Sequence, residues 1–126
     1  MNVVDSSGWL EYFANGVNAD FFAPAITDEE RLVVPTICLY EVFKRLSLLR
    51  GKEDALLAVG MLYRGQLAEL NDEIALDAAL ISLEYKLPLA ESVILATARH
   101  YDATLWTQDE HFEGIQGVQS VHKPGL

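Results

Sequence analysis

The sequence has little cysteine, little positive charge and no long hydrophobic run. Cys38 is the single cysteine in 126 residues, which excludes an internal disulfide and favours a reducing cytoplasm. Charged residues interrupt the apolar runs well before the roughly 20 residues that a membrane-spanning helix needs. No basic stretch precedes an apolar one at the N-terminus, and Asp5 interrupts it early, so no signal peptide is predicted. We therefore expect a cytoplasmic protein with no membrane partner.

Positive charge is scarce because nine Lys and Arg residues stand against nineteen Asp and Glu, giving a net charge of −10. Proteins that bind long nucleic acids usually carry a strongly basic face, so broad phosphate binding by this chain alone is not expected. An acidic chain is compatible with metal binding, with a basic protein partner or simply with solubility. Composition does not choose among these.

Two other kinds of site are not indicated. The sequence contains no glycine-rich phosphate loop. His100, His111 and His122 share no regular spacing and have no paired cysteine, so a zinc site is not expected. His111 lies beside Asp109 and could touch a substrate, but we interpret it as a surface residue in a turn.

Strand-like and helix-like segments alternate along the chain. β-prone runs cover 2–5, 31–35, 66–70, 103–107 and 118–121, and helical patterns cover 7–13, 36–51, 52–64, 71–85 and 87–101. Pro24 predicts that the helix around 19–26 is short and irregular. Residues that suit helix N-caps stand at Ser6, Ser7, Thr36 and Asn71. The alternation predicts an α/β fold, with helices on both faces of a mostly parallel sheet, in a single domain over 1–126.

Four acids are predicted to gather at one edge of this sheet. Asp5 ends the first strand, and Asp109 lies just past the strand that ends at Thr107. Glu41 lies in the second turn of the helix after the second strand, and Glu91 lies near the start of the helix that leads into strand 103–107. In open parallel sheets, ligands bind beyond the carboxyl ends of the strands, so all four acids can point toward one site.

Each acid also has a purely structural interpretation. Asp5 and Asp109 could cap a helix or a turn, and Glu41 could pair with Lys44 or Arg45 on its own helix, an interaction worth only about 0.2–0.5 kcal/mol. Glu91 is harder to explain in this way because its helical neighbours are apolar, and a carboxylate there is costly without compensation. Carboxylates without His or Cys partners suit Mg²⁺ or Mn²⁺, and such ions promote phosphodiester hydrolysis.

Four segments, "VVDSSGWLEYF", "LYEVFKRL", "LPLAESVILATA" and "TLWTQDEHFEGI", occur in the order and spacing of PIN-domain proteins. The chain most resembles the VapC-type ribonuclease toxins of bacterial toxin–antitoxin pairs. The resemblance implies a three-layer domain whose parallel sheet of four or five strands is flanked by helices. It also implies a Mg²⁺- or Mn²⁺-dependent endoribonuclease that acts as the toxin of a type II pair.

The resemblance places the family's metal-binding and catalytic acids on Asp5, Glu41, Glu91 and Asp109. The third acid of the family is usually an aspartate in a "LADA"-like motif, whereas this chain has Glu91 in "LAES". The extra methylene moves the carboxylate by about 1.5 Å. The family's small hydroxyl residues match Ser7 and Thr107, to which we give supporting roles.

The resemblance further implies an RNA substrate, a homodimer and a small antitoxin whose tail presents a basic side chain to the acids. Arg45 could hold an RNA phosphate at the edge of the groove, although a solvated helix face is an equal alternative. Apolar residues within 56–63 exceed one helical stripe and suggest a surface for a partner. Two other functions remain open: a PIN-fold binding protein that no longer cuts, and another acid-cluster phosphohydrolase acting on DNA or small phosphates.

Overall fold

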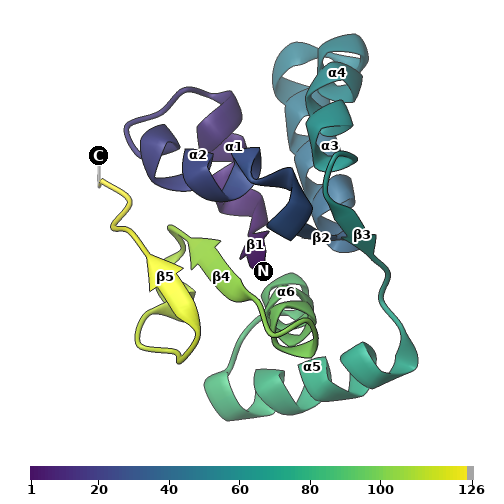
Figure 1. Cartoon of the computed structure of the whole chain (residues 1–126), viewed down its shortest axis with the longest axis vertical. Coiled ribbons are helices and arrows are strands. Elements are labelled where there is room, and N and C mark those ends of the chain that lie inside the picture. Colours follow the sequence, from purple (N-terminus) through teal and green to yellow (C-terminus); the bar gives the residue numbers. More distant parts are fainter. Residues whose placement is uncertain (125–126) are drawn as a thin grey trace.

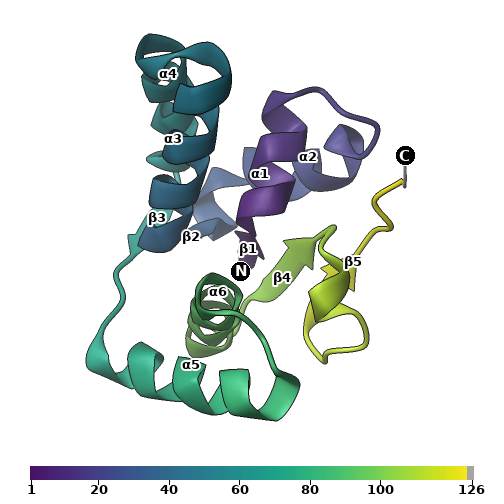
Figure 2. The same cartoon turned by 180° about the vertical axis from the view of Figure 1, so that it is seen from behind.

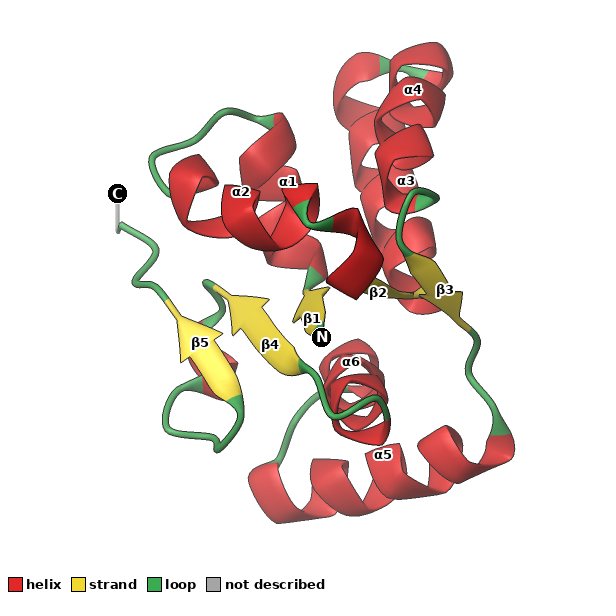
Figure 3. Ribbon diagram, viewed as in Figure 1, coloured by secondary structure: helices red, strands yellow, loops and turns green. Residues whose placement is uncertain are grey.

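The computed structural model describes residues 1–124, which contain five short strands (Figures 1 and 3). Each pair of neighbouring strands is parallel. Three of them pair in the order β1 (Asn2–Val4), β4 (Thr104–Thr107) and β5 (Val118–Ser120). The other two, β2 (Val33–Pro35) and β3 (Gln66–Ala68), pair with each other and meet β1 through a parallel bridge between Asn2 and Leu32. The predicted parallel α/β arrangement is therefore confirmed.

Helices lie on both sides of the strands (Figures 1 and 2). They are α1 (Ser6–Phe13), α2 (Ala19–Thr27), α3 (Thr36–Arg50), α4 (Lys52–Leu62), α5 (Asp72–Tyr85) and α6 (Leu89–His100), with short 3₁₀ turns η1 (Glu29–Arg31) and η2 (Glu110–Phe112). Helices α1 and α2 pack against β1 and β4 on one side, while α6 packs against the strands on the other and α5 packs on α6. Gly51, whose φ of 89° suits glycine, joins α3 to α4.

The core lies on both sides of the strands, and it includes Trp9 of α1 and Phe22 of α2 as well as residues of α6. Val3 and Val4 of β1 are completely buried, as is Leu105 of β4. Every residue of α6 from Ser92 to Ala98 is buried, because this helix has the strands on one side and α5 on the other. Within the described residues, no helix combines the length and apolar character needed to cross a membrane.

Three local predictions were wrong. The helix that contains Pro24 runs from Ala19 to Thr27; Pro24 and Asp20 are both exposed, so water can bond the Asp20 carbonyl that proline leaves without a donor. The N-cap of α1 is Asp5, and Ser6 and Ser7 are already helical.

Thr36 likewise begins α3 and caps nothing with its side chain, because Pro35 occupies the N-cap position. The predicted cap at Asn71 is confirmed, since its side chain accepts a hydrogen bond from the Ile74 amide.

Candidate active site at the carboxyl ends of the strands

Asp5 and Asp109 follow two strands that are direct neighbours. Strand β1 pairs with β4 in parallel, with Val4 opposite Trp106, and the Asp5 amide continues the pairing by donating to the Trp106 carbonyl at 3.1 Å. Because both strands end at the same edge, the two aspartates emerge on the same side of the sheet. This part of the sequence prediction is confirmed by the strand register.

The Asp5 carboxylate is buried and held by three hydrogen bonds. One oxygen accepts from the Ser7 hydroxyl at 2.8 Å and from the Gly8 amide at 2.9 Å, and the other accepts from the Thr107 hydroxyl at 2.5 Å. Only 3% of Asp5 is exposed, and this burial raises its pKa to about 6 although the hydrogen bonds act in the opposite direction. The structure thus confines a carboxylate that is costly to ionise without a nearby cation.

Thr107 connects the two aspartates. Its hydroxyl donates to Asp5 and accepts from the Asp109 amide at 2.9 Å. Asp109 then caps η2, because its side chain accepts from the His111 amide at 2.9 Å. Asp5 caps α1 and Asp109 caps η2, which was the structural alternative that the sequence left open. The capping hydrogen bonds also fix the positions of the two carboxylates.

Glu41 reaches this edge of the sheet from α3. The Ser6 hydroxyl, next to Asp5 in the chain, donates to a Glu41 oxygen at 2.6 Å. The alternative ion pair with Lys44 or Arg45 is not observed among residues 1–124, and the Lys44 ammonium instead lies 3.3 Å from the Tyr40 hydroxyl. Glu41 therefore has a hydrogen-bond donor near Asp5 and, within that described part of the chain, no cation of its own.

Glu91 contacts His111, which the sequence predicted to be a surface residue in a turn beside Asp109. The Nδ1 atom of His111 lies 2.8 Å from a Glu91 oxygen and 3.5 Å from an Asp109 oxygen. His111 is indeed on an exposed turn, with 54% of its side chain accessible, but its ring joins the acids. Burial raises the pKa of Glu91 and the bond from His111 lowers it, while the bond to Glu91 raises the pKa of His111.

Glu91, Asp109 and His111 form the tight group of the site. One potential ligand atom from each lies within 4.8 Å of the others, whereas Asp5 and Glu41 lie outside this group. The five residues are linked by short contacts: Asp5 through Thr107 to Asp109, Asp109 through His111 to Glu91, and Glu41 through Ser6 to the residue beside Asp5. The four predicted acids are neighbours at one edge, and the sequence did not predict that the His111 ring would contact two of them.

The donor set fits a divalent cation. Carboxylate oxygens with one imidazole nitrogen are common ligands of such ions. The ion pairs of residues 1–124 bring no Lys or Arg to any of the four acids. A nearby metal charge would compensate the buried Asp5 carboxylate, whose hydrogen-bond donors are neutral groups.

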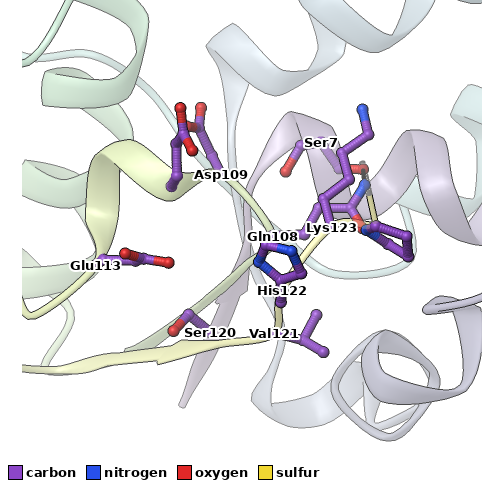
Figure 4. A pocket seen from close by; sticks show the side chains of 10 residues that line it. Ser7, Gln108, Asp109, Glu113, Ser120, Val121, His122 and Lys123 are labelled. Carbon is purple, nitrogen blue, oxygen red and sulfur yellow. Dashed lines mark hydrogen bonds between the residues drawn. The ribbon is translucent and has the colours of Figure 1, made fainter. Parts of the chain in front are cut away.

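Two hollows flank the acids. The first, of about 490 Å³, lies beside Asp109 and Ser7 and is also lined by Gln108, His122 and Lys123; Figure 4 shows these side chains around it. The second, of about 680 Å³, begins at Glu41 and Ser6 and is lined by Leu10, Tyr40, Lys44, Arg45, Ser47 and Leu48. Arg45 is exposed there, on the same helix as Glu41.

Comparisons with known proteins agree with this architecture. The structure of a toxin–antitoxin complex from Klebsiella pneumoniae contains a chain that is 22% identical, with a TM-score of 0.79 over 94% of this chain and 96% of that one. VapBC2 from Rickettsia felis, bound to a DNA fragment from its promoter, is 13% identical, with a TM-score of 0.73 over 94% and 97%. VapC20 from Mycobacterium tuberculosis, a sarcin–ricin loop cleaving toxin, is 13% identical, with a TM-score of 0.67 over 82% and 85%.

At these low sequence identities, the TM-scores establish similarity of fold alone. A search of curated proteins found no significant match. The family model of the PIN domain matches residues 3–118, a range that contains all five strands except the first residue of β1 and the last two of β5. The chain therefore belongs to the PIN domain family.

Proposed function

We propose that the protein is a metal-dependent endoribonuclease and the cytoplasmic toxin of a type II toxin–antitoxin pair. The observation that carries the proposal is the buried Asp5 carboxylate, hydrogen-bonded by Thr107 and linked through it to Asp109. Such an arrangement costs stability unless a cation joins it. Membership of the PIN domain family and the fold of the VapBC complexes support the nuclease interpretation.

In this proposal Asp5, Glu41, Glu91 and Asp109 hold Mg²⁺ or Mn²⁺, directly or through water. The ion, when bound, polarises the scissile phosphate and lowers the pKa of the attacking water. Thr107 and Ser7 act as positioning residues because they fix the Asp5 carboxylate by hydrogen bonds at 2.5 and 2.8 Å. Four acids also repel a phosphate, so RNA binding should depend on the ion.

The two hollows suggest where RNA and antitoxin bind. RNA would cross the acids from the Arg45 side to the hollow beside Asp109, where Lys123 offers a positive charge. The hollow at Glu41 is lined in part by the apolar side chains of Leu10 and Leu48, which suits the tail of a small antitoxin whose basic side chain reaches the acids. The net charge of −10 favours such a basic partner.

Exposed apolar side chains support a homodimer. Leu56 and Leu57 on α4, in the segment whose apolar residues suggested a partner surface, are 53% and 78% exposed. Leu80 and Leu83 on α5 are 65% and 78% exposed. Large apolar patches on a protein surface commonly mark contacts between proteins, and α5 lies on the side of the molecule away from α1 and α2 (Figure 1).

The first test is cleavage of a mixed RNA pool by the purified full chain, freed of any partner, in Mn²⁺, in Mg²⁺ and in EDTA. The wild type is compared with Asp5→Asn and with Asp77→Asn, which makes the same charge change on the exposed face of α5. We expect metal-dependent cutting that Asp5→Asn abolishes and Asp77→Asn retains. Equal inactivity of all three folded proteins would contradict the nuclease.

One observation favours a second candidate, a PIN-fold binding protein that does not cut. The third acid is a glutamate, and it is engaged by His111 at 2.8 Å. Under that alternative the chain would bind metal or a partner but cleave nothing. Parallel assays on RNA, DNA and a chromogenic phosphate ester also separate a ribonuclease from another phosphohydrolase.

A further inference from the structure

The backbone of η2 holds His111 in place next to the acids. Its amide donates to Asp109 at 2.9 Å, and the following residue, Phe112, is completely buried in the core. The Nδ1 atom lies 2.8 Å from Glu91 Oε2 and 3.5 Å from Asp109 Oδ1. The ring nitrogen is therefore directed at two carboxylates by a turn that is itself anchored.

We propose that His111 Nδ1 is a ligand of the metal ion at this site, together with Glu91 and Asp109, and that the site consequently prefers a first-row transition ion over Mg²⁺. This inference rests on the metal-dependent function proposed above. It adds a nitrogen to a donor set in which the sequence predicted only oxygens.

The separations between the donor atoms suit one shared ion. Ligands bound at about 2.1 Å lie roughly 3 Å apart when adjacent and about 4.2 Å apart when opposite. The His111 contacts of 2.8 and 3.5 Å lie close to the distance between adjacent ligands, and the three atoms all lie within 4.8 Å of one another. An ion would need only small movements of three side chains, of which His111 is largely exposed.

The length of Glu91 is part of the argument. An aspartate at this position would withdraw the carboxylate by about 1.5 Å and break its hydrogen bond with His111. The longer side chain thus moves the third acid toward η2, where a nitrogen is present. Mg²⁺ strongly prefers oxygen ligands and usually keeps several waters, whereas transition ions accept imidazole.

Mn²⁺ is the probe for the test because its electron spin resonance reports both binding and ligands. The full chain is titrated with Mn²⁺, and electron spin echo modulation is recorded on the bound ion. We expect the ¹⁴N modulation of a directly bound imidazole. His111→Gln should abolish it and weaken Mn²⁺ binding by about tenfold or more, with a smaller effect on Mg²⁺.

His100→Gln is the matched control, since His100 is exposed at the opposite end of α6. It should leave both the modulation and the affinity unchanged. Mn²⁺ bound to the wild type without ¹⁴N modulation would overturn the role of His111 and leave the proposed nuclease standing. A wild-type chain that binds neither ion at millimolar concentration would overturn both.

Discussion

The hydroxyl of Thr107 lies 2.5 Å from the carboxylate of Asp5, although the two residues are 102 positions apart in the chain. The same hydroxyl accepts a hydrogen bond from the Asp109 amide at 2.9 Å. One buried side chain therefore orients the acids that follow two neighbouring strands.

Thr107→Val keeps the shape of this side chain and removes its hydrogen bonds. We expect the free energy of unfolding to fall by about 1–3 kcal/mol, because the buried Asp5 carboxylate loses one of its three donors and the Asp109 amide loses its acceptor. Thr107→Ser should lose much less. Urea unfolding measures the difference, and equal stability of Val and Ser variants would contradict the role of the hydroxyl.

Asp5→Asn should stabilise the metal-free protein at neutral pH. The pKa of Asp5 is about 6 in the fold against 3.8 for the free side chain, so the folded state binds the extra proton. Protonated Asp5 therefore favours the folded state below pH 3.8, and this contribution to the free energy of unfolding is lost as the pH rises through 6. The loss amounts to about 3 kcal/mol. Asparagine stays neutral and avoids this loss.

The measurement is the free energy of unfolding against pH, in EDTA, for the wild type and Asp5→Asn. Their difference should grow between about pH 4 and 6 and then level off. Added Mn²⁺ should raise the melting temperature of the wild type and leave that of Asp5→Asn nearly unchanged. Asp77→Asn should behave as the wild type in both respects.

Gly8→Ala should destabilise the first turn of α1, whose Gly8 amide donates a hydrogen bond to Asp5. A β-carbon at Gly8 would lie 2.6 Å from the Phe22 ring and 2.7 Å from the Val4 side chain, so these atoms would have to shift. We expect a decrease of about 1–3 kcal/mol in the free energy of unfolding. Gly60→Ala is the control, since its β-carbon would meet open space in α4 and should stabilise by about 0.5–1 kcal/mol.

Arg45→Gln should weaken RNA binding. Arg45 is exposed in the hollow that begins at Glu41. If it holds an RNA phosphate as proposed, removing its charge should raise KM several-fold with little change in kcat. The salt dependence of RNA binding should become shallower at the same time. Lys86→Gln removes a charge at the C-cap of α5 and should change neither, so equal effects of the two variants would argue against a specific contact.

Sequence reasoning recovered the strands and most helices because buried periodicity and turn residues are local signals. It also placed Asp5 and Asp109 at one edge, since the order of strands and helices implies a parallel sheet. It assigned the cap of α1 to Ser6 or Ser7 because those residue types are common caps. Asp5 is equally suited, and the strand pairing of its amide with Trp106 decides the outcome.

The hydrogen bond between His111 and Glu91 could not be predicted in the same way. The two residues are 20 positions apart, on a helix and on a turn that only the intervening strand β4 brings together. Their meeting depends on the angle at which α6 crosses the strands and on the length of one glutamate side chain. Neither quantity leaves a pattern in the sequence.

The pairing of β1 with β4 also determines when, during synthesis of the chain, the candidate site can form. Strand β1, which leads to Asp5, leaves the ribosome first, but its partner β4, which contains Thr107 and leads to Asp109, follows about a hundred residues later. Contacts so distant in the chain form late in folding. An incomplete chain that stops before β4 contains Asp5, Glu41 and Glu91 yet lacks Thr107, Asp109 and the strand that aligns them, so nascent chains and early-terminated products should not be able to assemble the candidate site.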